Sequence, residues 1–215
     1  SVNAFAHQAF TLVSSQKKIV TEAELAKLEK DATVGKKSGA SLTFTENEIR
    51  LVVVTGPEDD MLSYRIEGMR NPNLIVLSGA KLKILFVNLD GDMKHDMRFG
   101  HVIGEFDIAP DVTETAGTEK LASHEEKDPM QSEEFVFKAN EDGAYKYFCL
   151  VRGHAKGAMC GNILVGVKPG MDLKMSVKPA GDAKMDNMPG MKPGEKLSEK
   201  NPDDISRMPG MKPTA

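Results

Sequence analysis

Seven short apolar runs, separated by turn residues, constrain the fold of this chain more than any other feature of its sequence. They lie between about Ala40 and Val167 and are rich in β-branched and aromatic residues, which favours strands. Strands of this length and number close into a sandwich or a Greek-key barrel, so the fold class is all-β. The predicted strands are Leu42–Phe44, Ile49–Thr55, Leu74–Leu77, Leu82–Leu89, Phe135–Phe137, Tyr145–Leu150 and Ile163–Val167.

The segments around these runs divide the chain into three predicted parts. Residues 1–40 form an N-terminal extension in which Thr21 and Glu24 fit a capping box, so we expect one short helix there, ended by Gly35. The stretch from Asn3 to Val13 suits either a second helix or an added strand. Residues 41–167 form the β domain, in which Gly104 to Ser132 is polar and is predicted to be a long loop.

A change of composition marks the third part, residues 168–215. This tail holds seven of the 13 Met and seven of the 11 Pro residues and no aromatic residue. It repeats Met188-Pro-Gly-Met-Lys-Pro193 at Met208-Pro-Gly-Met-Lys-Pro213. We expect a flexible Met/Pro-rich tail, because such a sequence cannot bury a core. Its thioethers suit Cu(I), but a plain flexible linker explains the composition equally well.

Charge and cysteine content exclude several classes of protein. With 28 Lys and Arg against 32 Asp and Glu, the chain of 215 residues lacks the positive charge that nucleic-acid binding needs. No apolar run approaches the ~18 residues of a membrane span. Two Cys cannot form a disulfide framework, and five His are too few for a multinuclear copper oxidase. Any metal is therefore expected in one small site.

The segment from Tyr147 to Gly161 carries the chemistry. Cys149 ends an apolar aromatic run, His154 follows five residues later, and Met159 follows after five more. A thiolate, an imidazole and a thioether in one loop suit copper better than zinc or magnesium. A second imidazole would complete a trigonal His₂Cys plane with Met as weak axial ligand. His95, which follows the run Leu82–Leu89, is the candidate.

These residues carry a resemblance to a known family. The chain resembles the cupredoxins, and among them the rusticyanins, from about Val20 to Val167. The similarity includes the capped helix, Asn71-Pro-Asn-Leu, Phe86-Val-Asn88 ahead of His95, and the Cys149, His154 and Met159 loop before Gly161. It implies a Greek-key β-barrel and one type 1 copper with His95, Cys149, His154 and Met159 as ligands. It also implies single-electron transfer rather than enzymatic catalysis.

Three positions depart from the family pattern. Arg152 stands where relatives have Pro, and Ala158 precedes Met159 where rusticyanins have Gly. Asp96 follows His95 where they have Ser. A carboxylate at that position is expected to favour Cu(II) and so to lower the reduction potential.

Other interpretations of the same residues are weaker. A zinc site made by Cys149, His154 and Cys160 lacks a fourth ligand, and a Cys–His protease pair lacks an orienting third group. Cys160 is predicted to be a packing residue. The remaining histidines are predicted to lie on the surface or in loops: His7, His101 and His124.

The expected role is that of an electron carrier. The expected partner is a redox protein such as a cytochrome or oxidase with an acidic face, which docks at His154 on Val151, Ala155 and Ala158 beside the cations Arg152 and Lys156. The alternative is a periplasmic protein for copper tolerance or delivery that uses the tail for Cu(I). By analogy with the family, a thiolate-copper centre and an N-terminus at Ser1 from which a targeting segment has been removed fit a periplasmic or other extracytoplasmic compartment. We also expect a monomer.

Overall fold

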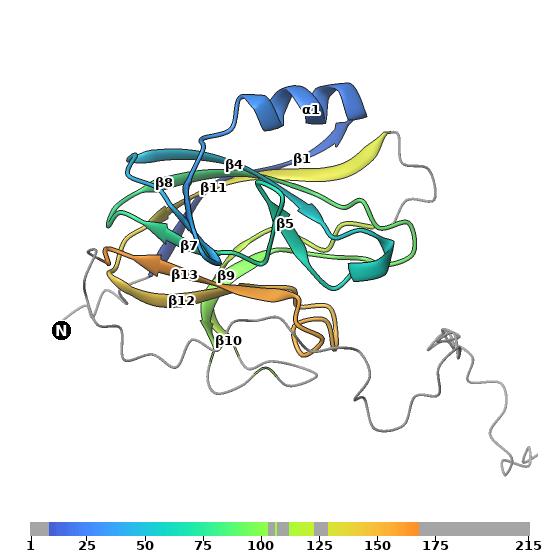
Figure 1. The fold of residues 1–215 in the computed structure, drawn as a ribbon. Helices are drawn as coiled ribbons and strands as arrows, with labels where there is room; N and C mark the ends of the chain where they lie inside the picture. The colour runs from blue at the N-terminus through green and yellow to red at the C-terminus, as the bar shows by residue number, and fades with distance from the viewer. Residues whose placement is uncertain (1–8, 103–105, 107–111, 123–128, 168–215) are drawn as a thin grey trace, which may run out of the picture. The chain divides into compact units, whose positions relative to one another are not determined.

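The structure is a computed structural model, and it describes residues 9–102, 106, 112–122 and 129–167. Two β-sheets face each other, with one short helix lying over one of them (Figure 1). No helix in these ranges is long and apolar enough to cross a membrane. The tail 168–215, with its methionine repeat, lies outside the described residues. The division at residues 40 and 167 stays a prediction.

Both sheets mix parallel and antiparallel pairs. Parallel pairing joins β4 to β8, β3 to β7 and β7 to β13, while the other neighbours are antiparallel. One sheet has the order β1 (Phe10–Val20), β11 (Met130–Ala139), β8 (Lys81–Val87), β4 (Glu48–Thr55), β5 (Tyr64–Ile66) and β6 (Met69–Arg70). The other has the order β10 (Val112–Gly117), β9 (Arg98–Val102), β12 (Gly143–Phe148), β13 (Cys160–Val165), β7 (Asn73–Val76), β3 (Ser41–Thr43) and β2 (Lys36–Ser38). The predicted all-β fold class is confirmed.

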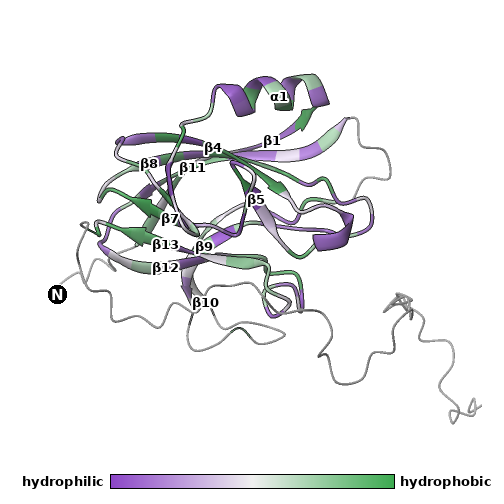
Figure 2. Ribbon diagram, in the orientation of Figure 1, coloured by the Kyte–Doolittle hydropathy of each residue, from purple (hydrophilic) through white to green (hydrophobic). Residues whose placement is uncertain are grey.

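Alternating side chains build the core between the sheets. Along β4, Ile49, Leu51 and Val53 point inward and are fully buried or nearly so, while their neighbours are more exposed, as a strand with one solvent-facing side requires. Figure 2 shows hydrophobic residues along the strands, whereas α1 carries hydrophilic residues mixed with hydrophobic ones. Aromatic rings fill the centre, where Phe10, Phe99 and Phe137 meet at centroid distances of 4.7 to 6.2 Å. Such offset and edge contacts add to the stability gained from burial.

The predicted helix is confirmed as α1 (Glu22–Lys30), and its start follows the predicted capping box. Thr21 Oγ1 accepts from the Glu24 backbone N–H, and the Glu24 carboxylate accepts from the Thr21 N–H. The predicted end at Gly35 is wrong, because the helix stops at Lys30 with Asp31 as its cap. Thr33 then bonds to the backbone of Arg50 in β4 through both its N–H and its hydroxyl. These bonds replace further helical turns.

Six strands were not predicted: β1, β2, β5, β6, β9 and β10. The undecided stretch from Asn3 to Val13 contains the start of β1, which runs antiparallel to β11 with a bulge near Val13. The predicted loop from Gly104 to Ser132 is corrected, because it contains β10 and the first residues of β11. Each of the seven predicted strands is present with its ends shifted by a few residues.

Candidate metal centre

Three connections between strands bring the candidate ligands together. His95 lies between β8 and β9, where its backbone forms a two-way bridge with Leu121. Cys149 directly follows β12, and Met159 directly precedes β13, with His154 in the loop between them. Because β12 and β13 are antiparallel neighbours, the two ends of this loop lie side by side. The backbone N–H of Cys149 donates to the Met159 carbonyl at 3.2 Å.

Internal hydrogen bonds hold this loop in one conformation. The N–H of Met159 donates to the His154 carbonyl at 2.9 Å, and the N–H of His154 donates to the Val151 carbonyl at 3.0 Å. Gly157 donates to Gly153 at 2.9 Å in the same way. The loop is therefore a set of tight turns that fixes the spacing of its three sulfur and nitrogen donors.

The candidate ligand atoms converge in a buried space. One atom each from His95, Cys149 and His154 lie within 4.8 Å of one another. His95 Nδ1 lies 3.3 Å from His154 Nδ1 and 3.1 Å from Met159 Sδ, and Cys149 Sγ lies 3.6 Å from His154 Nδ1. His95, Cys149 and Met159 have no exposed surface, whereas His154 keeps 8%. Only His154 reaches the surface.

This donor set fits a soft cation. Nitrogen and sulfur lone pairs face one another here, and the thioether has no hydrogen to donate. The hydrogens available to pair these atoms are that of the Cys149 thiol, which is a weak donor, and those of the imidazole rings. A cation among them would pair all of them at once. Two imidazoles, one thiolate and a weak thioether form the donor set typical of a blue-copper electron-transfer site.

Burial sets the protonation of the metal-free site. Burial, followed by the nearby Asp96 carboxylate, raises the pKa of the Cys149 thiol far above its usual range. Burial, followed by the charge of His95, lowers the pKa of His154 to about 4. At neutral pH the thiol therefore keeps its proton and His154 is neutral. A metal bound here displaces the thiol proton.

Asn71 supports the end of the loop next to Met159. Its side-chain Nδ2 donates to the Ala158 carbonyl at 2.9 Å, and its Oδ1 accepts from the Tyr64 N–H at 2.8 Å. Ala158 has φ of 80°, a left-handed conformation that favours glycine. This explains why the family pattern has Gly at this position. The predicted departure at Ala158 therefore places backbone strain beside the candidate axial ligand.

Asp96 is buried against the loop rather than facing solvent. Its Oδ1 accepts from the Leu150 N–H at 2.6 Å, and its backbone carbonyl accepts from the Tyr64 hydroxyl at 2.6 Å. Burial raises the pKa of Asp96, although the hydrogen bond from Leu150 opposes this. The carboxylate thus ties the residue after His95 to the residue after Cys149.

The structure brings together all four predicted ligands: His95, Cys149, His154 and Met159. Their role as copper ligands stays a prediction. Cys160 is not part of the group; it packs with Phe148 and Ala155 in a small apolar cluster, as predicted. His101 is exposed as predicted, but it lies on β9. His7 and His124 lie outside the described residues.

Two features of this region were not predicted correctly from sequence. Ala155 was expected in an exposed docking patch, but it is 3% exposed because it packs on Phe148 and Cys160. Asp90, to which no role was assigned from the sequence, has its Oδ2 2.9 Å from His95 Nε2. Its position five residues before a predicted metal-ligating histidine was the available signal.

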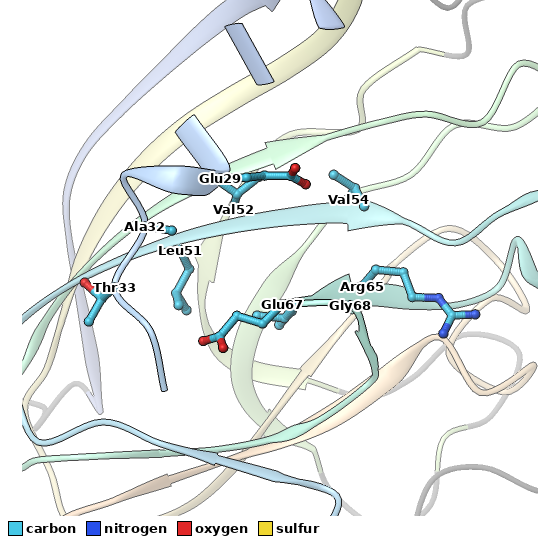
Figure 3. A pocket seen from close by; sticks show the side chains of 10 residues that line it. Glu29, Ala32, Thr33, Leu51, Val52, Val54, Arg65, Glu67 and Gly68 are labelled. Carbon is cyan, nitrogen blue, oxygen red and sulfur yellow. The ribbon is translucent and has the colours of Figure 1, made fainter. Parts of the chain in front are cut away.

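A cleft lies elsewhere, where the end of α1 meets β4 and β5. Figure 3 shows its side chains, which include Glu29, Thr33, Val52, Arg65 and Glu67. None of the candidate ligands lines it. Its mixture of aliphatic and oppositely charged side chains does not converge on one point, so we assign it no chemistry.

Comparisons with known proteins agree with the fold. A rusticyanin from Acidithiobacillus ferrooxidans is 25% identical over 141 residues, which cover 65% of this chain and 89% of the relative. A rusticyanin from Acidithiobacillus ferridurans is 25% identical over 158 residues, covering 73% and 83%. No family model matches the sequence.

Solved structures show the same fold. A rusticyanin structure from Thiobacillus ferrooxidans superposes with a TM-score of 0.63 at 23% identity, covering 71% of this chain and 98% of the other. A second structure, described as a copper protein, rusticyanin, superposes with a TM-score of 0.62 at 24% identity, covering 70% and 97%. The predicted resemblance is confirmed, since nearly the whole of each structure is matched.

Proposed function

We propose, from the premise that the chain is a rusticyanin-like cupredoxin, that it carries single electrons between redox proteins at one type 1 copper held by His95, Cys149, His154 and Met159. The observation that carries this proposal is the convergence of two imidazole nitrogens, a thiol and a thioether in one buried space. Copper bound there would accept one electron and release it again. No substrate has to bind for this role.

The chain's own residues favour fast electron transfer. Thiolate and thioether sulfur suit Cu(I), while imidazole and thiolate suit Cu(II), so one donor set serves both oxidation states. The hydrogen bonds between Cys149 and Met159 and between Met159 and His154 hold that set in place. Burial of Cys149 and Met159 excludes water from the sulfur ligands. Little rearrangement is then needed when the charge of the site changes.

Repeated reduction and oxidation of the full chain tests the proposal. We expect the copper-loaded protein to be reduced by ascorbate and reoxidised by hexacyanoferrate(III) with one electron per chain and no loss of copper over many cycles. The control is the metal-free protein, which should show no such exchange. Release of copper at each reduction would contradict the role of a carrier.

Electrons are proposed to pass through His154, the one candidate ligand with exposed surface. The side chains of Arg152 and Lys156 on the same loop are exposed, and their positive charge would attract a partner with an acidic face. With Ala155 buried, the apolar part of this surface reduces to the half-buried Val151 and Ala158. A cytochrome or oxidase would dock there weakly and in a salt-dependent way.

Small redox reagents of opposite charge test this docking surface. The double variant Arg152→Glu/Lys156→Glu should slow oxidation by the anion hexacyanoferrate(III) and speed oxidation by the cation tris(phenanthroline)cobalt(III) at low salt. A matched variant, Lys30→Glu/Lys36→Glu, changes the net charge equally through exposed residues on α1 and β2 and should have a smaller effect. Equal effects of the two variants would remove the docking surface from the proposal.

The methionine repeat favours a second function, the handling of Cu(I). Met188 and Met191 recur in the second copy as Met208 and Met211, and thioethers are soft ligands for Cu(I). Replacing these four residues by Leu in the full chain should lower the number of Cu(I) ions bound above one per chain and leave the redox cycle unchanged. An unchanged Cu(I) stoichiometry would dismiss this function.

A further inference from the structure

Asp90 is a buried carboxylate, and each of its two oxygen atoms lies within hydrogen-bond distance of a partner. Oδ1 accepts from the backbone N–H of Asp92 at 2.7 Å and from that of Met93 at 3.0 Å. Oδ2 lies 2.9 Å from His95 Nε2, and the side chains of Asp90 and His95 are 1% and 0% exposed. The two backbone N–H groups on Oδ1 favour the ionised carboxylate. Because an ionised carboxylate has no hydrogen to donate, the His95 Nε2 that faces Oδ2 has to be the donor.

Asn88 fixes the position of this carboxylate. Its Oδ1 accepts from the Asp90 N–H at 3.0 Å, while its Nδ2 donates to the Met93 carbonyl at 3.0 Å and to the Ala122 carbonyl at 3.1 Å. The turn after β8 is thus held at both ends and tied to the chain beyond Leu121. Because Asn88 is itself 2% exposed, water does not compete for these bonds.

We infer that Asp90 is a positioning residue that keeps the hydrogen of the His95 ring on Nε2, so that Nδ1 presents its lone pair to the metal. This inference deepens the proposed function and rests on it for the identity of the metal. Metal-ligating histidines commonly donate their second ring N–H to a carboxylate, which fixes the tautomer and strengthens the ligand. Here His95 Nδ1 is the ring atom that faces Met159 and His154.

The negative charge of Asp90 also acts on the redox balance. A carboxylate in contact with a ligand ring favours the more highly charged metal ion, because buried charges interact strongly. Asp90 therefore stabilises Cu(II) relative to Cu(I) and lowers the reduction potential. A neutral side chain of the same size should raise the potential.

Asparagine cannot replace Asp90 without losing a bond. If the amide oxygen takes the place of Oδ1 and accepts from Asp92 and Met93, the amide NH₂ faces His95 Nε2, and two donors meet. The ring then has to move its hydrogen to Nδ1, the atom needed for the metal. If the amide turns the other way, the NH₂ meets two backbone N–H groups instead.

Nitrogen NMR of the metal-free full chain tests the tautomer directly. In the natural protein His95 should carry its hydrogen on Nε2. Asp90→Asn should lose that pattern, bind copper 10- to 100-fold more weakly, and raise the reduction potential once loaded. The control, Asp92→Asn, removes one carboxylate from the same turn, but its side chain is exposed, so tautomer, affinity and potential should stay close to those of the natural protein.

The outcomes separate this inference from the proposed function. A hydrogen on Nδ1 in the natural metal-free protein would overturn the inference without any variant, so a poorly folded Asp90→Asn protein does not leave the question open. Equal copper affinity and potential in Asp90→Asn and the natural protein would also overturn it. If copper fails to bind while the hydrogen lies on Nε2, the proposed function fails and the positioning role of Asp90 stands.

Discussion

The aromatic centre of the sandwich and the candidate metal centre are both buried, but they are built from different interactions. In the aromatic centre, Phe10, Phe99 and Phe137 contact one another through ring edges and faces. In the metal centre, buried polar groups such as Asp90, Asp96 and Asn71 each reach a hydrogen-bond partner. Packing of the first kind depends on volume, whereas a polar network depends on the identity of each atom.

Because the two regions depend on different interactions, the stability of the fold and the binding of a metal should be separable in the described part of the chain. Loss of a ring from the aromatic centre should weaken the fold and leave the ligands as they are. A change in the metal centre should alter metal binding more than folding. The variants below begin with the largest expected effect: the first tests that separation, the second tests backbone strain beside the candidate ligands, and the third is a reference outside both regions.

Phe137→Ala should produce the largest loss of stability. The ring is fully buried among three other rings, and truncation of a buried Phe typically costs about 3–5 kcal/mol. Urea denaturation of the metal-free protein measures this loss. The copper-loaded variant should keep the absorption spectrum of the natural protein at a temperature where it is folded. An altered spectrum would show that packing in the aromatic centre also determines the geometry of the ligands, and would contradict the separation.

Ala158→Gly should have a smaller and opposite effect on stability. Glycine adopts the left-handed conformation of this residue freely, so relief of strain should stabilise the metal-free protein by about 1 kcal/mol, and the bond from Asn71 to the carbonyl is kept. Thermal denaturation measures the gain. The matched variant Ala155→Gly lies in the same loop, and Ala155 has no positive φ. It should lose stability, and a gain in both variants would refute the role of strain.

Asp60→Asn tests a charged cluster away from both regions. Asp60 accepts hydrogen bonds from Arg65 and Arg70 at 2.7 Å each. Burial raises the pKa of Asp60, but the hydrogen bonds from Arg70 and the positive charges of Arg70 and Arg65 outweigh it. The pKa of Asp60 therefore lies below its usual value. Stability from this group is therefore complete above the unfolded-state pKa and is lost as pH falls through the folded-state pKa.

For this partly exposed group, we expect Asp60→Asn to cost about 1 kcal/mol at pH 7 and almost nothing once the pH lies below the folded-state pKa of Asp60. Urea denaturation as a function of pH measures the difference. Asp59→Asn, at an exposed neighbour, should change little at either pH. A cost for Asp60→Asn that stays constant with pH would contradict the assigned charge pairing.

The sequence indicates the buried strands well and the exposed ones poorly. Runs such as Ile49–Thr55 are predictable because one face is buried, which produces alternation. Strand β1 gives no such signal, because nearly all of its residues between Phe10 and Val20 are exposed. Its position depends on pairing with β11, a segment more than a hundred residues later. Local patterns cannot report such a distant partner.

The candidate metal centre likewise contains residues that the sequence predicts and residues that it does not. Cys149, His154 and Met159 are predictable because one loop carries them at regular spacing. The partners that support them come from other parts of the chain: Asn71 is far away in sequence, and Asp90 looks like an ordinary Asp-Gly turn. Their roles depend on three-dimensional contacts with the loop and with His95. The buried position of Ala155 likewise depends on the neighbouring Phe148.

The visible absorption spectrum of the Cu(II)-loaded full chain tests the central claim most directly. We expect an intense thiolate-to-copper band that is absent from Cys149→Ser. Cys160→Ser is the matched control, because Cys160 is also buried but lies outside the candidate ligand group, and it should keep the band. A colourless natural protein, or a band that survives in Cys149→Ser and disappears in Cys160→Ser, would contradict the account.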